Sequence, residues 1–139
     1  LAAFCDLRVA VDDAEFGVPT TDIGQIPSGG STYRVTQLIG EAKVKELVYT
    51  AGMVGAEEAH DIGFLNHVVP RSELDDCVDG LADAIRDTGR QAVKNSKRAI
   101  NYGANAPDLD TAREYEAEVW WEQFATEERA RLVDEFVDE

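Results

Sequence analysis

The stretch FGVPTTDIGQIPSGGSTYR runs from Phe16 to Arg34, and it is the most informative part of this chain. Four glycines and two prolines interrupt it, which excludes a regular helix or strand across its whole length. It therefore predicts an irregular loop that leads into a helix. Loops of this kind, held by a rigid scaffold, are where binding and catalytic residues are usually placed.

On either side of this stretch, the hydrophobic pattern predicts a mixed α/β chain. Leu7, Val9 and Val11 alternate with other residues, which is typical of a half-buried strand. Phe64–Val69 predicts a second, buried strand. A helical apolar stripe runs from Leu74 to Ile85. Further helices are expected over residues 32–39, 42–50, 56–62, 91–102, 111–125 and 127–137, with Pro107 and Asp108 opening the fifth of these.

The charge balance excludes some classes of partner. The chain carries 28 acidic and 13 basic residues, for a net charge of −15. Such a charge argues against nucleic acid or an anionic membrane as the main partner. Carboxylates spread along every helix favour a halophilic source; the alternative is an acidic protein whose charge aids solubility. With neither a signal-peptide pattern nor an apolar membrane span, a soluble cytoplasmic protein is expected.

No metal site is expected from the cysteines and histidines. Cys5 and Cys77 are far apart in the sequence and stand among apolar residues, so we expect buried free thiols. His60 and His67 are expected at the surface, and two histidines alone do not make a metal site.

Several segments, in order, resemble the crotonase superfamily, also called the enoyl-CoA hydratase/isomerase family. The stretch from Phe16 to Arg34 is similar to that family's signature FGxPE…LGxIPGGGGTQR. The resemblance covers nearly the whole chain. The matching segments are LAAFCDLR (1–8), FGVP (16–19), IGQIPSGGSTYR (23–34), LIG (38–40), EL (46–47), AEEA (56–59), IGFLN (62–66), VVP (68–70) and FATEE (124–128).

The resemblance implies an α/β fold. Residues 1–70 would form the C-terminal part of a spiral of ββα units, and residues 71–139 a helical region that packs trimers, often paired into hexamers. The chain opens on Leu1 inside an apolar stretch, so we expect it to be the C-terminal half of a longer protein. The family's oxyanion donors and first glutamate would then precede Leu1, and residues 1–139 alone would be inactive.

The resemblance also implies chemistry on an acyl-CoA thioester, with coenzyme A as part of the substrate and no separate cofactor. In family hydratases two glutamates hold a water and move protons. Thr20 stands where the second glutamate is expected. A hydroxyl orients a water but is no base near neutral pH. Asp22 is the candidate substitute, since in an extended segment it would project on the same side as Thr20; the alternative is a loop or capping carboxylate.

Two further residues are candidates for substrate binding. Ser28 stands where hydratases have a glycine whose N–H helps to hold the water; it would otherwise be the N-cap of the following helix. Phe124, with Trp120 and Trp121, would line an acyl pocket or a subunit contact. One of the two tryptophans is expected to meet a neighbouring subunit, because adjacent residues on a helix point about 100° apart.

The sequence leaves three functions open. Hydration of a 2-enoyl-CoA is the leading interpretation. Thioester hydrolysis or decarboxylation needs the oxyanion hole without the same glutamate pair, and a non-catalytic assembly subunit would keep only the fold. Three other branches of the family each use a carboxylate at a position where this chain has none. The enoyl-CoA isomerases have it at the position of Thr20, the dihydroxynaphthoyl-CoA synthases at that of Pro27 and the aryl-CoA dehalogenases at that of Ser28, so all three branches are disfavoured.

Overall fold

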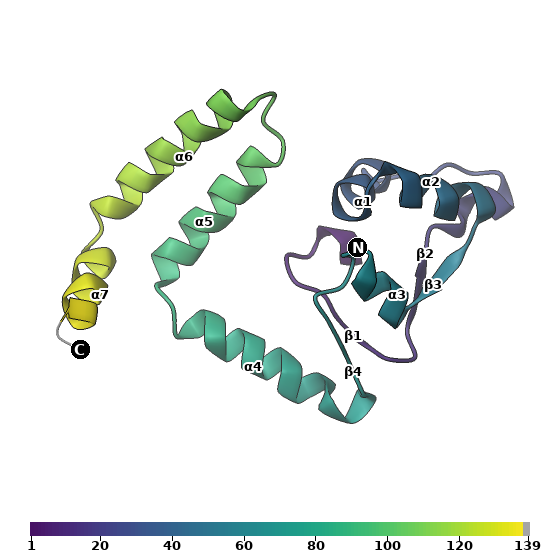
Figure 1. Cartoon of the computed structure of the whole chain (residues 1–139), viewed down its shortest axis with the longest axis horizontal. Coiled ribbons are helices and arrows are strands. Elements are labelled where there is room, and N and C mark those ends of the chain that lie inside the picture. Colours follow the sequence, from purple (N-terminus) through teal and green to yellow (C-terminus); the bar gives the residue numbers. More distant parts are fainter. Residues whose placement is uncertain (138–139) are drawn as a thin grey trace. The chain divides into compact units, whose positions relative to one another are not determined.

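The computed structural model describes residues 1–137, and the chain forms two compact units (Figure 1). The first unit comprises Leu1–Asp79 and the second begins at Gly80. The boundary falls inside helix α4 (Leu74–Arg86), whose apolar stripe the sequence predicted. The predicted division at residue 70, and the oligomerisation role of residues 71–139, stay predictions.

Four short strands organise the first unit. β1 (Val9–Val11) pairs in parallel with β4 (His67–Val69), with Val9 opposite His67. β2 (Glu15–Gly17) pairs antiparallel with β3 (Met53–Gly55). The two pairs form separate two-stranded sheets, and each joins segments that are far apart in the sequence (Figure 1).

Helices fill the rest of the first unit, and the predicted ones are confirmed. They are α1 (Ser31–Ile39), α2 (Glu41–Thr50) and α3 (Ala56–Asp61), together with the 3₁₀ helices η1 (Ala2–Phe4), η2 (Pro19–Ile23) and η3 (Arg71–Glu73). Gly40 separates α1 from α2 with a φ of 80°. Glycine enters this left-handed region without a steric penalty, so the chain turns sharply there.

The core of the first unit is apolar. Phe16 and Phe64 pack at its edge, with ring centroids 5.3 Å apart. Burial of such side chains is the main force that holds α2 and α3 against the strands. The buried cluster consists of Ala10, Leu47, Val54, Ala56, Ala59 and Leu65.

Two predictions about the first unit are wrong. The strand expected over Phe64–Val69 is reduced to His67–Val69, because the backbone N–H groups of Phe64 and Leu65 donate instead to the carbonyl of Ala59, at 2.8 and 3.1 Å. Those residues complete the end of α3 and have no donor left for a ladder. Cys5 is a free thiol, as expected, but it is exposed instead of buried.

The second unit contains α5 (Arg90–Gly103), α6 (Leu109–Phe124) and α7 (Glu127–Val137), as predicted to within two residues at each end. Asp108 begins α6 as its N-cap and accepts a hydrogen bond from the Thr111 backbone N–H at 2.7 Å. The start of α5 is capped from α7. There the Glu128 carboxylate accepts from the backbone N–H of Gln91 at 2.7 Å and of Ala92 at 3.3 Å.

A buried asparagine lies at the contact between α5 and α6. Asn95 is only 3% exposed. Its Nδ2 donates to Gln123 Oε1 at 2.9 Å, and its Oδ1 accepts from Gln91 Nε2 and from Arg98 Nη1, both at 3.2 Å. These bonds satisfy the buried amide, so its burial is compatible with a stable helix pair.

Candidate functional site

The candidate site is centred on η2, the 3₁₀ turn that carries Thr20. Pro19 stands in the first turn, where its fixed φ and missing N–H cost nothing. Two backbone bonds close the turn: Gln25 N–H donates to the Thr20 carbonyl and Gly24 N–H to the Thr21 carbonyl, both at 3.0 Å. Gly24 ends it with a φ of 70°.

The Thr20 hydroxyl is buried, and it has no hydrogen-bond partner among the described residues. Buried polar side chains in proteins are nearly always paired, and an unpaired one costs about 1–3 kcal/mol. An exception of this kind calls for an explanation, and a water or ligand group as the missing partner is one that the site role of Thr20 would supply. Among the predicted site residues, Thr20 is therefore the one with an unused hydrogen-bonding group inside the fold.

Asp22 lies on the same turn but is exposed. The extended geometry that the argument for Asp22 assumed does not occur, because Pro19–Ile23 is a 3₁₀ helix with three residues per turn. Residues two apart on such a helix do not share a face, so the argument that placed Asp22 beside the Thr20 hydroxyl is lost. The role of Asp22 as a substitute base stays a prediction.

Ser28 lies in the exposed loop between η2 and α1. Its backbone carbonyl accepts two hydrogen bonds from Ser31, one from the backbone N–H at 3.2 Å and one from the side-chain Oγ at 2.7 Å. It is not the N-cap of α1, as one interpretation held: the helix begins at Ser31 and its N-cap is Gly30. Its role in holding a water stays a prediction.

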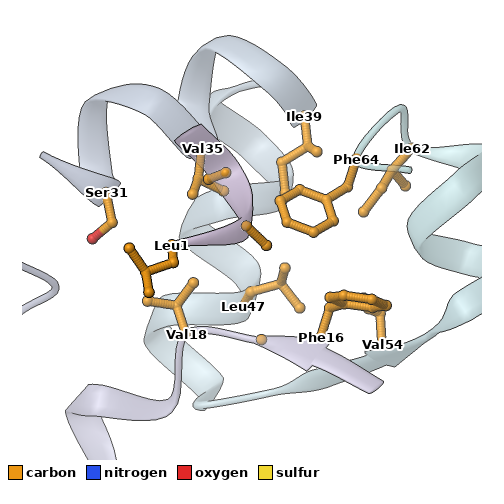
Figure 2. Close-up of a pocket in the computed structure, with 13 residues that line it drawn as sticks. Leu1, Phe16, Val18, Ser31, Val35, Ile39, Leu47, Val54, Ile62 and Phe64 are labelled. Carbon is orange, nitrogen blue, oxygen red and sulfur yellow. The ribbon is translucent and has the colours of Figure 1, made fainter. Parts of the chain in front are cut away.

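An apolar cavity of about 230 Å³ lies in the first unit (Figure 2). Val18, which immediately precedes η2, is part of its wall, and Figure 2 shows Leu1 and Ser31 close to Val18. Ser31 contributes the sole polar side chain among the lining residues. The others are Leu1, Ala2, Ala3, Phe16, Gly17, Val18, Val35, Ile39, Leu47, Val54, Ile62 and Phe64. This lining suits an aliphatic group, but it contains no carboxylate or imidazole that would act as an acid or a base.

Two arginines hold the η1 wall of this cavity. Arg34 Nε donates to the Ala3 carbonyl at 3.0 Å, and Arg8 Nη1 donates to the Cys5 carbonyl at 2.6 Å. The Arg8 guanidinium also lies 5.5 Å from the centre of the Phe64 ring. Desolvation, followed by repulsion from Arg34, lowers the pKa of Arg8 from its usual value. The carbonyl groups that end η1 are thus satisfied by cationic donors, as helix C-termini favour.

Phe124, the fourth predicted site residue, belongs to the second unit, whereas the other three belong to the first. It ends α6 and is 43% exposed. Its ring stacks on Trp120, with centroids 5.1 Å apart, and the Arg129 guanidinium lies 4.3 Å from its centre. Trp120 and Trp121 are 54% and 63% exposed, so α6 carries an aromatic surface.

The remaining titratable groups fit a solvated surface. His60 and His67 are exposed, as predicted. Arg98 of α5 contacts Glu122 of α6 at 2.7 Å, and this hydrogen bond raises the pKa of Arg98. Within residues 1–137, no three His, Cys, Asp or Glu side chains are grouped to hold a metal ion. No helix in the part that the structure describes is both long and apolar enough to cross a membrane.

One residue that matters here was missed in the sequence. Thr21 Oγ1 donates to the Val48 carbonyl of α2 at 2.5 Å and so ties η2 to that helix. Nothing in the local pattern predicts this contact, because it spans 27 residues and joins a loop to a helix end.

Comparison with known proteins identifies the family. The family model described as enoyl-CoA hydratase/isomerase matches residues 1–139. The short-chain-enoyl-CoA hydratase of Clostridium acetobutylicum is 38% identical over 138 residues, which are 99% of this chain and 52% of that protein. The crotonyl-CoA hydratase of Syntrophomonas wolfei is also 38% identical, over 99% of this chain and 53% of its own.

The fold agrees with this assignment. The crystal structure of an enoyl-CoA hydratase from Bacillus anthracis matches with a TM-score of 0.94 at 32% identity, covering 98% of this chain and 52% of that one. The predicted α/β crotonase-like fold is thereby confirmed. This chain spans about half the length of the curated relatives compared above. Sequence and fold agree that it belongs to the enoyl-CoA hydratase/isomerase family.

Proposed function

We propose that the full-length protein hydrates a short-chain 2-enoyl-CoA thioester. Two relatives at 38% identity carry the names short-chain-enoyl-CoA hydratase and crotonyl-CoA hydratase, which supports this substrate class. Coenzyme A enters as part of the substrate, and no separate cofactor is needed. The water oxygen bonds to the β-carbon, a proton is delivered to the α-carbon, and the C=C double bond becomes single.

The observation that carries the proposal is the buried hydroxyl of Thr20, which has no hydrogen-bond partner within residues 1–137. In the family pattern this position belongs to a glutamate that holds the attacking water. A threonine hydroxyl can accept or donate a hydrogen bond to that water, but it does not take its proton near neutral pH. The family's first glutamate, expected just before Leu1, would then carry the proton transfer. The reaction would be slower than with two carboxylates.

Substitutions at Thr20 test this role. Thr20→Val keeps the shape but removes the hydroxyl, so hydration of crotonyl-CoA should fall about twofold to tenfold, the effect of one hydrogen bond. Thr20→Glu restores the second carboxylate and should raise the rate. The measurement is kcat with crotonyl-CoA in the full-length protein. Thr36→Val is the matched control, since Thr36 Oγ1 donates within α1, to the Thr32 carbonyl at 2.6 Å. Wild-type activity in both Thr20 variants would contradict the assignment.

A second candidate function follows from the same residue. Because threonine replaces a carboxylate, the site also suits a reaction that needs the oxyanion hole without a second base, such as hydrolysis or decarboxylation of an acyl-CoA. Assays of the full-length protein for free coenzyme A and for carbon dioxide separate these from hydration. In that case Thr20→Glu should abolish the native activity instead of raising it. No turnover in any of these assays would favour a non-catalytic assembly subunit.

The remaining assignments are part of the same proposal. Asp22 would assist with protons, Ser28 would hold the water through its N–H, and Phe124 would contact the acyl-CoA. The exposed rings of Trp120 and Trp121 would be covered by a neighbouring subunit in a homotrimer or hexamer, located in the cytoplasm. The exposure of those rings supports a contact surface, since large aromatic side chains are favoured at interfaces.

We also propose a halophilic source, on the basis of the net charge of −15. Repulsion among the 28 carboxylates is screened by salt, so the full-length protein should be more stable in molar than in millimolar KCl. Thermal melting at the two concentrations checks this. Equal midpoints would support the alternative, an acidic surface that serves solubility alone.

A further inference from the structure

The two neighbouring threonines of η2 have opposite surroundings. Thr20 has a buried hydroxyl without a partner among the residues that the structure describes. Thr21 is exposed, yet its hydroxyl donates to the Val48 carbonyl at 2.5 Å. Buried hydroxyl groups are usually hydrogen-bonded within the protein, whereas exposed ones need no protein partner; in these two adjacent residues the opposite holds. This reversal suggests that the two hydroxyl groups have different tasks.

The Val48 carbonyl is a suitable attachment point. It lies in the last turn of α2, where carbonyl groups lack the full set of intrahelical partners. The backbone N–H that approaches it, that of Ala51, is at the long distance of 3.5 Å. The Thr21 hydroxyl thus takes an acceptor that the helix itself leaves largely unused.

The turn needs such an attachment. A 3₁₀ helix of five residues has poor hydrogen-bond geometry and does not fix its own position. The two bonds at its end, Gly24 N–H to Thr21 O and Gln25 N–H to Thr20 O, hold its shape only. The Thr20 side chain makes no bond to the described protein that would hold it in place. Within residues 1–137, the Thr21 side chain is the one in the turn for which a hydrogen bond to a neighbouring helix is found.

We infer that Thr21 is a positioning residue, which sets the place of the Thr20 hydroxyl by fixing η2 on α2. The inference rests on the proposed function, because it takes the Thr20 hydroxyl to be the group that meets the water. Small displacements of such a group reduce the rate of the chemical step more than they reduce substrate binding.

Kinetics of Thr21 variants in the full-length protein test the inference. Thr21→Val keeps the branched shape and loses the bond, so kcat for crotonyl-CoA hydration should fall about three- to tenfold while KM stays unchanged. Thr21→Ser keeps the hydroxyl and should restore kcat. The matched control is Thr50→Val, because Thr50 Oγ1 donates to the Glu46 carbonyl at 2.7 Å, a bond within the same helix.

A double-mutant cycle separates positioning from a merely structural role. If Thr21 acts through the Thr20 hydroxyl, Thr21→Val should have no further effect on kcat once Thr20 is already valine. If Thr21→Val lowers kcat equally in the wild-type and Thr20→Val proteins, or does not lower it in the wild-type protein, the inference is overturned and the proposed function is left intact. A Thr20→Val variant with wild-type kcat would overturn the proposed role of Thr20, and the inference with it.

Discussion

The two units of the chain differ in how their buried polar side chains are hydrogen-bonded. In the first, the buried cluster is apolar and a buried hydroxyl, that of Thr20, is left unpaired among the described residues. In the second, the buried Asn95 is paired on both sides of its amide, while the rings of Trp120 and Trp121 are exposed. In the second unit, the buried amide is thus satisfied by neighbouring side chains of the protein itself. The unpaired hydroxyl in the first unit is compatible with the proposed role of Thr20 in holding a water.

The largest effect is expected from the apolar core of the first unit. Leu47 is 5% exposed and lies in the main buried cluster, so Leu47→Ala should lower the free energy of unfolding by about 2–5 kcal/mol. Urea unfolding of the full-length protein measures it. Leu109, 71% exposed at the start of α6, provides the control, and Leu109→Ala should change stability by less than about 0.5 kcal/mol. Similar losses in both variants would mean that the first unit does not depend on this core.

The polar centre of the second unit should contribute less. Asn95→Ala removes the partner of Gln123, Gln91 and Arg98 and leaves polar groups without bonds, at a cost of about 1–3 kcal/mol in the same assay. Asn101→Ala on the exposed side of α5 is the matched control, with little expected change. If both variants have the wild-type free energy of unfolding, the hydrogen bonds of Asn95 do not stabilise the second unit.

The smallest effect is expected at the cap of α6. The hydrogen bond from the Thr111 backbone lowers the pKa of Asp108, so the ionised cap stabilises the folded state above the usual aspartate pKa. That contribution is lost as the pH falls through the lowered value. Asp108→Ala should reduce the melting midpoint slightly at neutral pH, whereas Asp108→Asn keeps an acceptor and should remove mainly the pH dependence. Melting curves from neutral to acidic pH compare the three proteins; identical acid profiles would exclude a role for this carboxylate.

The sequence predicts local elements well where their boundaries are set by local chemistry. Gly40 ends one helix and Asp108 begins another, and both were placed correctly because a left-handed glycine and a capping carboxylate act over a few residues. The strand pair of Glu15–Gly17 with Met53–Gly55 was missed, since both strands are only three residues long, two of their six residues are glycines, and their pairing is tertiary. In the candidate site, the resemblance singled out Thr20, whose role stays a prediction, whereas the 3₁₀ geometry that places Asp22 on another face of the turn was not predicted.

The parallel pairing of β1 with β4 has a consequence for the order in which this chain acquires structure. Arg8 N–H bonds to the side chain of Asn66, 58 residues later, next to the point where the two strands meet. Everything between them, including the turn with Thr20, lies inside the segment that this contact closes. Contacts between distant residues form slowly, because the entropy of the intervening chain is lost before they contribute. During synthesis, the parallel strand pair that closes this segment therefore forms only after His67–Val69 has emerged from the ribosome.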